Sequence, residues 1–195
     1  MAVAVPPAGT VPERLTVERY FALVDEGVLQ PDDPVELLEG VIVAMAPSNA
    51  RHASATTRVA DAFRGAVGKR ALVREEKCLI LGLYSAPEPD VALVPGPHEA
   101  YDDADPRTAL LVVEAADSSL VQDRITKAAI YAGAGIPEYW IVNLRDDRVE
   151  AYRGPDPQAR RYAEQRRAVR GETLELVAFP GVHIAVDELL PRRAR

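Results

Sequence analysis

The chain has 195 residues, 48% of them hydrophobic and 27% charged, which is typical of one globular domain and excludes a disordered or fibrous protein. Its single cysteine, Cys78, excludes an internal disulfide and a thiolate zinc cluster, and no segment reaches the roughly 18 apolar residues of a membrane span, so we expect a cytoplasmic protein with no membrane partner. The net charge of −7 argues against a surface wholly adapted to nucleic acid, although residues 145–170 hold 8 basic and 5 acidic side chains.

The chain divides into three predicted parts. Residues 1–14 are rich in proline and small residues and predict a loose arm, residues 15–190 form one predicted domain, and residues 191–195 form a basic tail. The sequence contains no internal repeat and no low-complexity tract.

Local signals in the first third of the chain predict a helix, a hairpin and a longer helix. Thr16 is a favourable cap for a helix of about ten residues, which Gly27 ends. The apolar run 35–45 is interrupted by Glu39-Gly40, a pattern typical of two strands joined by a tight turn. Residues 48–66 repeat alanine and apolar side chains at helical spacing, which predicts the first long helix.

Three predicted strands follow, over residues 71–83, 90–94 and 109–115. The last two are nearly continuous apolar runs, which indicates strands buried on both faces and covered by helices. Residues 120–132 are predicted to form one of these helices. The remaining predicted strands cover residues 138–144, 149–153, 160–170, 174–179 and 182–186.

Two carboxylates stand at the edges of buried strands. Asp90 opens an apolar strand and Glu114 follows the apolar run of another. An ionised carboxylate in an apolar setting needs a cation, hydrogen-bond donors or a proton. The alternative is that both lie at strand ends in contact with water.

The helix after Glu114 could supply a third group. Asp123, Lys127 and Tyr131 follow one another at four-residue spacing and therefore share a helix face. If that face is exposed, Asp123 and Lys127 are an ordinary surface ion pair. If it packs over the sheet, Lys127 reaches the end of the strand that carries Glu114. Two carboxylates and a lysine suit phosphodiester hydrolysis, because hard oxygen ligands hold Mg²⁺ and an ammonium supports developing negative charge.

These residues resemble a known signature. Pro89-Asp90 followed by Val113-Glu114-Ala115 resembles the PD-(D/E)XK motif of restriction-endonuclease-like nucleases, although Ala116 stands where that motif has lysine. In the bacterial Uma-two family the lysine comes from the following helix, and this chain resembles that family over residues 15–152. The matching segments are Leu15-Thr16-Val17-Glu18, Val35-Glu36-Leu37-Leu38-Glu39-Gly40, His52, Glu88-Pro89-Asp90-Val91, Val113-Glu114-Ala115-Ala116-Asp117-Ser118-Ser119, Asp123 with Lys127 and Tyr131, and Ala134-Gly135-Ile136-Pro137-Glu138-Tyr139-Trp140-Ile141-Val142.

The resemblance implies an α/β (α+β) fold, restriction-endonuclease-like, with a mixed central sheet flanked by helices, an N-terminal helix and hairpin, and extra C-terminal strands. It also implies a divalent-metal-dependent DNA endonuclease with Mg²⁺ or Mn²⁺ as cofactor. Asp90 and Glu114 match the metal-binding acids and Lys127 matches the displaced lysine, so these three are the predicted catalytic residues. The predicted supporting residues are Glu36, His52, Asp123 and Tyr131.

Two further expectations concern partners. The locally basic stretch predicts phosphate contacts from Arg160, Arg161, Arg166 and Arg167, with a solvated hairpin face as the alternative. A homodimer is expected, because two copies of one small site related by a two-fold axis cut both strands of a duplex most simply.

Two other functions compete with the nuclease. One is a catalytically silent or regulatory DNA-binding protein that keeps the fold, which the acidic charge of the chain favours. The other is a sugar hydrolase that uses Asp90 and Glu114 as acid and base and would remain active in EDTA.

Overall fold

The structure is a computed structural model that describes residues 13–192. Most of the predicted arm (1–14) and residues 193–195 of the predicted tail (191–195) lie outside the described residues. The helices are α1 (Val17–Asp25), α2 (Ala50–Val67), α3 (Leu120–Gln122), the π-helix η3 (Asp123–Lys127), α4 (Ala128–Gly133) and α5 (Val186–Leu189), with 3-10 turns η1 (Gly68–Arg70) and η2 (His98–Tyr101). The strands are β1 (Val35–Leu38), β2 (Val41–Ala44), β3 (Leu72–Glu75), β4 (Val91–Val94), β5 (Leu111–Ala116), β6 (Glu138–Asn143), β7 (Arg148–Asp156), β8 (Arg161–Val169), β9 (Thr173–Glu175) and β10 (His183–Ala185).

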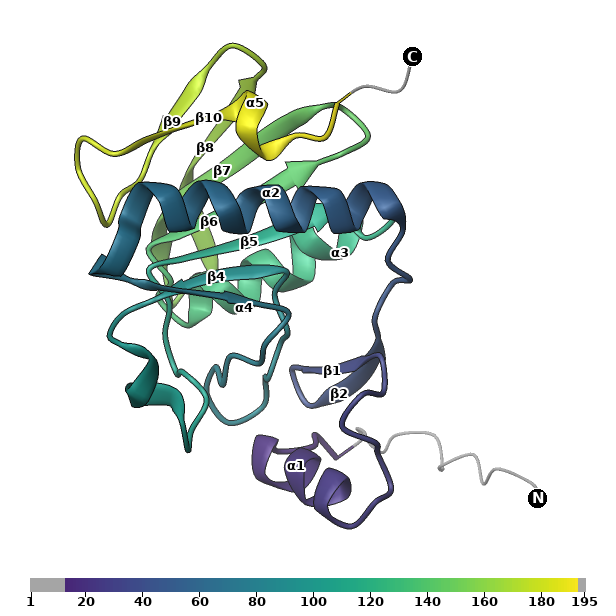
Figure 1. Cartoon of the computed structure of the whole chain (residues 1–195). Helices are drawn as coiled ribbons and strands as arrows, with labels where there is room; N and C mark the ends of the chain where they lie inside the picture. The colour runs from purple at the N-terminus through teal and green to yellow at the C-terminus, as the bar shows by residue number, and fades with distance from the viewer. Residues whose placement is uncertain (1–12, 193–195) are drawn as a thin grey trace.

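A six-stranded mixed sheet forms the centre of the molecule (Figure 1). Its strands lie in chain order from β3 to β8, and every neighbouring pair is antiparallel except β5 and β6. These two are parallel because the continuous helical segment α3–η3–α4 returns the chain to the same end of the sheet. The predicted mixed sheet is confirmed.

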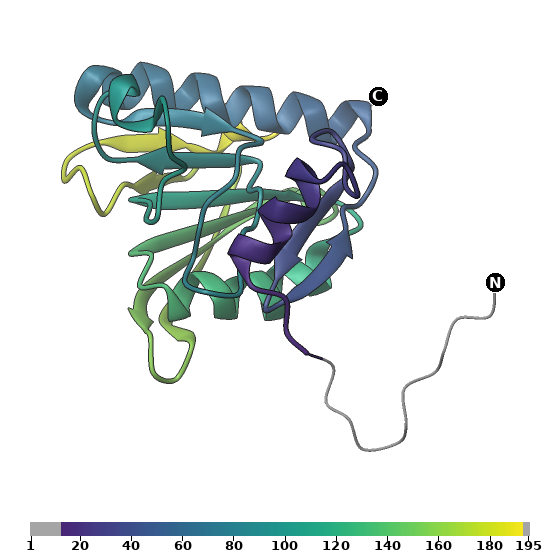
Figure 2. The ribbon, with the colours of Figure 1, turned by 90° about the horizontal axis from the view of Figure 1, so that it is seen from below.

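Helices cover both faces of this sheet (Figures 1 and 2). On one face Phe63 of α2 packs edge-on against Trp140, with ring centroids 5.6 Å apart. On the other face Ile130 and Tyr131 of α4 pack against Tyr139 of β6. Both helices predicted to cover the sheet are therefore found, on opposite faces. Within residues 13–192 no helix is long and apolar enough to cross a membrane.

The hairpin β1–β2 and helix α1 lie together beside the sheet (Figure 2). The turn between the strands places Glu39 at φ 53° and Gly40 at φ 83°, the left-handed conformation that a two-residue hairpin turn requires. Leu37 of the hairpin is fully buried against Val17 and Tyr20 of α1. This small cluster fixes the hairpin, and with it Glu36, against the rest of the domain.

Three predicted strands are wrong in extent. The strand predicted over 174–179 ends at Glu175, and no strand covers residues 176–179. The strand predicted over 71–83 ends at Glu75, because Glu76 adopts a left-handed φ of 49° and turns the chain away from the sheet edge. The chain then runs without regular structure as far as Asp90. The strand predicted over 182–186 is split between β10 and the short helix α5.

Candidate active site

Asp90 and Glu114 lie opposite each other at one end of the sheet. Val91 of β4 pairs with Val113 of β5, and continuing this antiparallel register by one residue places Asp90 across from Glu114. Directly opposed side chains of an antiparallel pair share a face, with Cβ atoms about 4.5–5.5 Å apart. Both acids line one cavity of about 470 Å³. Asp90 and Glu114 therefore lie on neighbouring strand segments and on the same face of the sheet.

The carboxylate of Asp90 is held from two sides. Oδ2 accepts a hydrogen bond from the backbone N–H of Ala115 at 2.6 Å, and Oδ1 lies 3.1 Å from Nε2 of His52. His52 stands in the first turn of α2, where Asn49 caps the helix, and its Nδ1 lies 3.2 Å from Oγ of Ser48. The hydrogen bond to Asp90 raises the pKa of His52. His52 therefore lines the cavity and contacts the Asp90 carboxylate directly.

Lys127 enters the same cavity from the helical segment and contacts two carboxylates. Its Nζ lies 3.0 Å from Oε1 of Glu114 and 3.2 Å from Oε2 of Glu36, and the residue is only 6% exposed. Tyr131, one turn later, donates its hydroxyl to the same Glu114 oxygen at 2.7 Å. Glu36 also accepts the backbone N–H of Glu88 at 3.2 Å. Four predicted residues, from β1, β5 and the helical segment, thus meet at one point.

Asp123 lies on the same wall but does not pair with Lys127. Its Oδ2 accepts a hydrogen bond from Oγ of Ser119 at 2.7 Å, and its backbone carbonyl accepts the hydroxyl of Tyr139 at 3.2 Å. Asp123 is 1% exposed, so the alternative of an exposed ion pair between Asp123 and Lys127 is wrong. The face that carries them packs inward because Ile130 and Tyr131 of the same segment belong to the core.

Negative charge exceeds positive charge in the cavity. Burial raises the pKa of Glu114 well above its usual range, and the nearby acids Asp90 and Asp123 add to the effect. Burial also raises the pKa of Asp123, to about 6. For Lys127, burial acts to lower the pKa, but the charges of Glu114 and Glu36 outweigh it and the ammonium is retained. The acids that line the cavity are Asp32, Asp33, Glu36, Glu76, Glu88, Asp90, Glu114 and Asp123, against Lys127 and His52.

This donor set fits a hard divalent cation. In Glu114, Oε1 accepts hydrogen bonds from Nζ of Lys127 and from the hydroxyl of Tyr131, whereas Oε2 accepts no hydrogen bond from the described residues. Among residues 13–192 no three His, Cys, Asp or Glu side chains converge tightly enough to hold a metal ion alone. Mg²⁺ does not need three protein ligands, because it keeps several bound waters and is held by one or two carboxylates together with substrate phosphates. Asp90 and Glu114 fit that requirement, and an additional cation would balance the excess of acids.

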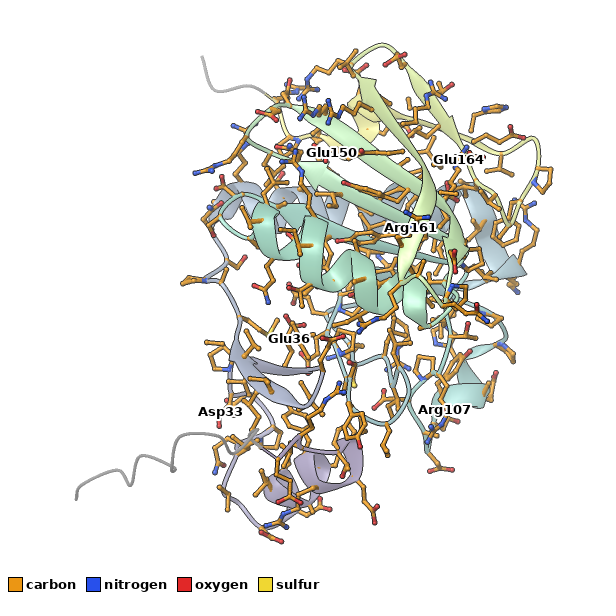
Figure 3. The ribbon with its side chains drawn as sticks, turned by 180° about the vertical axis from the view of Figure 1, so that it is seen from behind. Asp33, Glu36, Arg107, Glu150, Arg161 and Glu164 are labelled. Carbon is orange, nitrogen blue, oxygen red and sulfur yellow. The ribbon has the colours of Figure 1, made fainter. Side chains whose placement is uncertain are left out.

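The structure does not bring the four predicted phosphate-binding arginines to the cavity. Arg160, in the turn before β8, pairs with Glu39 of the hairpin turn. The other three lie exposed on β8, the edge strand furthest from β3, and Figure 3 labels Arg161 there. None of the four lines the cavity with Asp90. The arginines therefore mark a separate surface.

Several residues that line the cavity were not among the site residues predicted from the sequence. Glu88 directly precedes Pro89-Asp90, and its place beside a predicted acid could have drawn attention to it. Ser119 stands four residues before Asp123, the spacing at which helical side chains meet. Glu76 gave no signal, because its place on the cavity wall depends on the irregular segment after β3.

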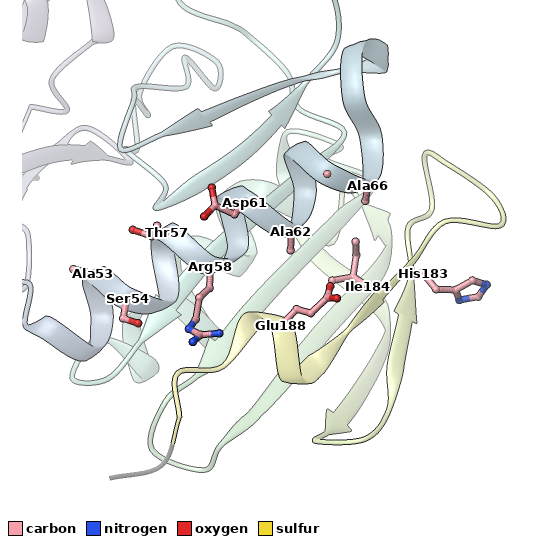
Figure 4. Close-up of a pocket in the computed structure, with 11 residues that line it drawn as sticks. Ala53, Ser54, Thr57, Arg58, Asp61, Ala62, Ala66, His183, Ile184 and Glu188 are labelled. Atoms are coloured by element: carbon pink, nitrogen blue, oxygen red, sulfur yellow. The ribbon is translucent and has the colours of Figure 1, made fainter.

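A second and larger cavity lies elsewhere. It has a volume of about 940 Å³ and lies between α2 and the C-terminal elements β10 and α5 (Figure 4). Its lining includes Arg58, Asp61, His183 and Glu188, and Figure 4 shows the His183 ring directed away from the groove. None of the predicted catalytic or supporting residues lines it.

Comparison with known proteins gives a concordant result. One solved structure, described as a "putative nuclease belonging to DUF820" from Anabaena variabilis ATCC 29413, superposes with a TM-score of 0.71 over 90% of this chain and 97% of that chain. At 15% sequence identity this likeness establishes a shared fold. No protein with a curated description matches the chain significantly. Residues 17–187 match the Uma2 family, whose description is "Putative restriction endonuclease", and the chain therefore belongs to the Uma2 family.

Proposed function

We propose that this chain is a divalent-metal-dependent DNA endonuclease that hydrolyses phosphodiester bonds. The family description and the nuclease fold support the reaction class. The observation that carries the proposal is the meeting of Asp90, Glu114 and Lys127 in one acidic cavity, from three separate elements. Buried charges are costly, so a cluster of this kind is more typical of a functional site than of a site that only stabilises the fold.

In this proposal Asp90 and Glu114 hold Mg²⁺ or Mn²⁺. The bound ion supplies positive charge against the phosphate and lowers the pKa of water, which is the chemistry that hydrolysis at neutral pH requires. Lys127 places a compact ammonium beside Glu114, where it can stabilise charge that develops on the phosphoryl oxygens. The reaction adds water across one P–O bond and leaves a phosphate monoester and a free hydroxyl group.

The remaining residues are proposed to hold these three in place. Glu36 fixes Lys127 through its second ion pair, and Tyr131 fixes the Glu114 carboxylate through its hydroxyl. His52 orients Asp90, in the manner of partners that orient the ligands of metal sites. Asp123 contributes negative charge to the wall next to Lys127.

Two finer expectations belong to the same proposal. The exposed arginines Arg161, Arg166 and Arg167 of β8 are proposed to contact DNA phosphates away from the cleavage site. The acting species is proposed to be a homodimer, since two copies of one small site related by a two-fold axis cut both strands of a duplex most simply.

The test is incubation of the purified protein with plasmid and single-stranded DNA across a range of Mg²⁺ and Mn²⁺, with EDTA as the metal-free arm. Asp90→Asn is the matched control, because it keeps the shape and the hydrogen bond from Ala115 while removing the charge. We expect cleavage by the wild type only with metal, and none by the variant. Binding of DNA without cleavage under every condition would support the silent DNA-binding alternative, and hydrolysis of sugars in EDTA would support the sugar hydrolase.

A further inference from the structure

Arg124 lies next to Asp123 in η3, yet it reaches away from the cavity. Its guanidinium forms a two-pronged contact with Glu150 of β7, in which Nε donates to Oε2 at 2.9 Å and Nη2 donates to Oε1. In Figure 3 the helical segment lies between Glu150 on one side and Glu36 on the other. Lys127 contacts Glu36 and Arg124 contacts Glu150, so the same turn is held from two opposite sides.

Glu150 is a rigid anchor for this contact. Its side chain is fully buried, and it also accepts hydrogen bonds from Asn143 at 2.9 Å, Arg148 at 3.1 Å and Tyr152 at 3.2 Å. Burial acts to raise the pKa of Glu150, but the hydrogen bonds from Arg124, Asn143 and Arg148 outweigh it and lower the pKa to about 2. These hydrogen bonds fix the Glu150 carboxylate in one position on β7, a strand that has neighbours on both sides.

The turn that Arg124 belongs to is unusual. Residues Asp123–Lys127 form a π-helix between two α-helical pieces, and single π turns are rare and occur mostly at functional sites. In an unbroken α-helix, residues four apart are offset by about 40°, so Asp123, Lys127 and Tyr131 would fan over about 80°. A π turn rotates the chain by a smaller angle per residue than an α turn. It therefore reduces the angle over which the side chains of Asp123, Lys127 and Tyr131 are spread. Contacts from outside hold this wide turn, and they include the two-pronged Arg124–Glu150 contact and the hydrogen bond from the Tyr139 hydroxyl to the Asp123 carbonyl.

We infer that Arg124 and Glu150 are positioning residues which hold the π turn and thereby set the location of the Lys127 ammonium between Glu36 and Glu114. The inference deepens the proposed function and rests on it for its catalytic consequence. Its structural part, the dependence of Lys127 on the Arg124–Glu150 contact, can be measured independently of any activity.

The structural test uses the small number of lysines. The chain has three, and Lys69 and Lys77 are exposed whereas Lys127 is buried. With lysine labelled with ¹³C and ¹⁵N, the ammonium protons of Lys127 are protected from exchange and give an NMR signal distinct from the other two. We expect Arg124→Met and Glu150→Gln to shift or broaden this signal. Arg148→Met is the matched control. Arg148 also donates a hydrogen bond to Glu150, but it lies on β7 and not on the helical segment, so its loss should leave the Lys127 signal in place.

The functional test is a double-mutant cycle on metal-dependent plasmid cleavage. We expect Arg124→Met to lower kcat about 10- to 100-fold with little change in KM, and Arg148→Met to change kcat less than about threefold. In a Lys127→Met background the same Arg124→Met change should lower kcat less than about twofold, because its effect acts through Lys127. Arg124→Lys should restore only part of the rate, since an ammonium cannot form the fork.

A Lys127 signal unchanged in both Arg124→Met and Glu150→Gln would overturn the inference. So would an equal loss of kcat from Arg124→Met in the presence and absence of Lys127, because that is the result of a general loss of stability. If the wild type cleaves no DNA, the proposed function fails while the NMR comparison still decides whether Arg124 and Glu150 position Lys127.

Discussion

Replacing Lys127 by methionine tests whether the buried ammonium holds the candidate site together. Methionine keeps the length of the side chain and its helix propensity but removes the charge. Glu114 and Glu36 then remain buried without the cation that contacts them at 3.0 and 3.2 Å. Removing one partner of a buried ion pair costs about 3–5 kcal/mol, and because Lys127 serves two carboxylates we expect a loss near the top of that range at pH 8.

The loss should depend on pH in a defined direction. Burial already raises the pKa of Glu114, and the charge of Lys127 lowers it. Without Lys127 this pKa therefore lies further above its unfolded value, and the variant is most stable where the carboxyl is protonated. Its stability then falls as the pH rises through the raised pKa. The difference between wild type and variant should therefore be small at pH 5. It should grow by up to about 1.4 kcal/mol for each pH unit between the folded-state pKa of Glu114 in the wild type and its higher pKa in the variant, and level off above that.

The assay is urea unfolding in EDTA at pH 5 and pH 8, with Lys69→Met as the control for loss of an exposed lysine. Cleavage by Lys127→Met in Mg²⁺ should fall about 10²- to 10³-fold, the scale for loss of one preorganised charge. A stability loss of a few tenths of a kcal/mol at both pH values, together with cleavage at the wild-type rate, would refute the reasoning. The assignment of the site would then be reduced to the two facing carboxylates.

Further predictions concern charge elsewhere in the fold. The lowering of the Glu150 pKa from 4.5 to about 2 should stabilise the fold by about 3 kcal/mol above pH 4.5. This contribution should be lost as the pH falls from 4.5 to 2. The unfolding free energy of the wild type should therefore decline more steeply over that interval than that of Glu150→Gln. If Asp90 and Glu114 hold Mg²⁺, saturating Mg²⁺ should raise the melting temperature of Lys127→Met more than that of the wild type, and an equal response would count against a cation beside Glu114. Neutralising Arg161, Arg166 and Arg167 together should reduce the slope of log K for DNA against log salt by about 3, whereas an unchanged slope would remove β8 from the DNA interface. Light scattering should give the mass of a dimer, and a monomer at high concentration would contradict the proposed assembly.

Elements with local signals could be predicted from the amino-acid sequence alone. Thr16 accepts a hydrogen bond from the N–H of Arg19, as a helix cap does, and Glu39-Gly40 forms the predicted two-residue turn. The continuous apolar runs around β4 and β5 became fully buried strands. Each of these features depends on residues within a few positions of one another, so composition and spacing carry enough information to predict them.

The pairing of Asp90 with Glu114 was also within reach of the sequence. Asp90 directly precedes β4 and Glu114 lies near the end of the neighbouring strand β5. The helix that carries Lys127 begins only a few residues after β5, so a short connection must bring it back over the sheet. The sequence left open whether Lys127 pairs with Asp123 on an exposed face. The structure decided this because burial of Ile130 and Tyr131 turns the whole face inward.

The family resemblance named Glu36 as a supporting residue, but its contact with Lys127 became apparent only from the arrangement of the elements in space. Glu36 stands in a separate hairpin that α1 packs against the domain, and no local pattern links it to Lys127. No sequence pattern singled out Glu150, yet the fold surrounds it with hydrogen-bond donors from η3, β6 and β7. The physical reason is the same in both cases: a buried charge is stable only with partners, and those partners come from elements that are neighbours in space and remote along the chain.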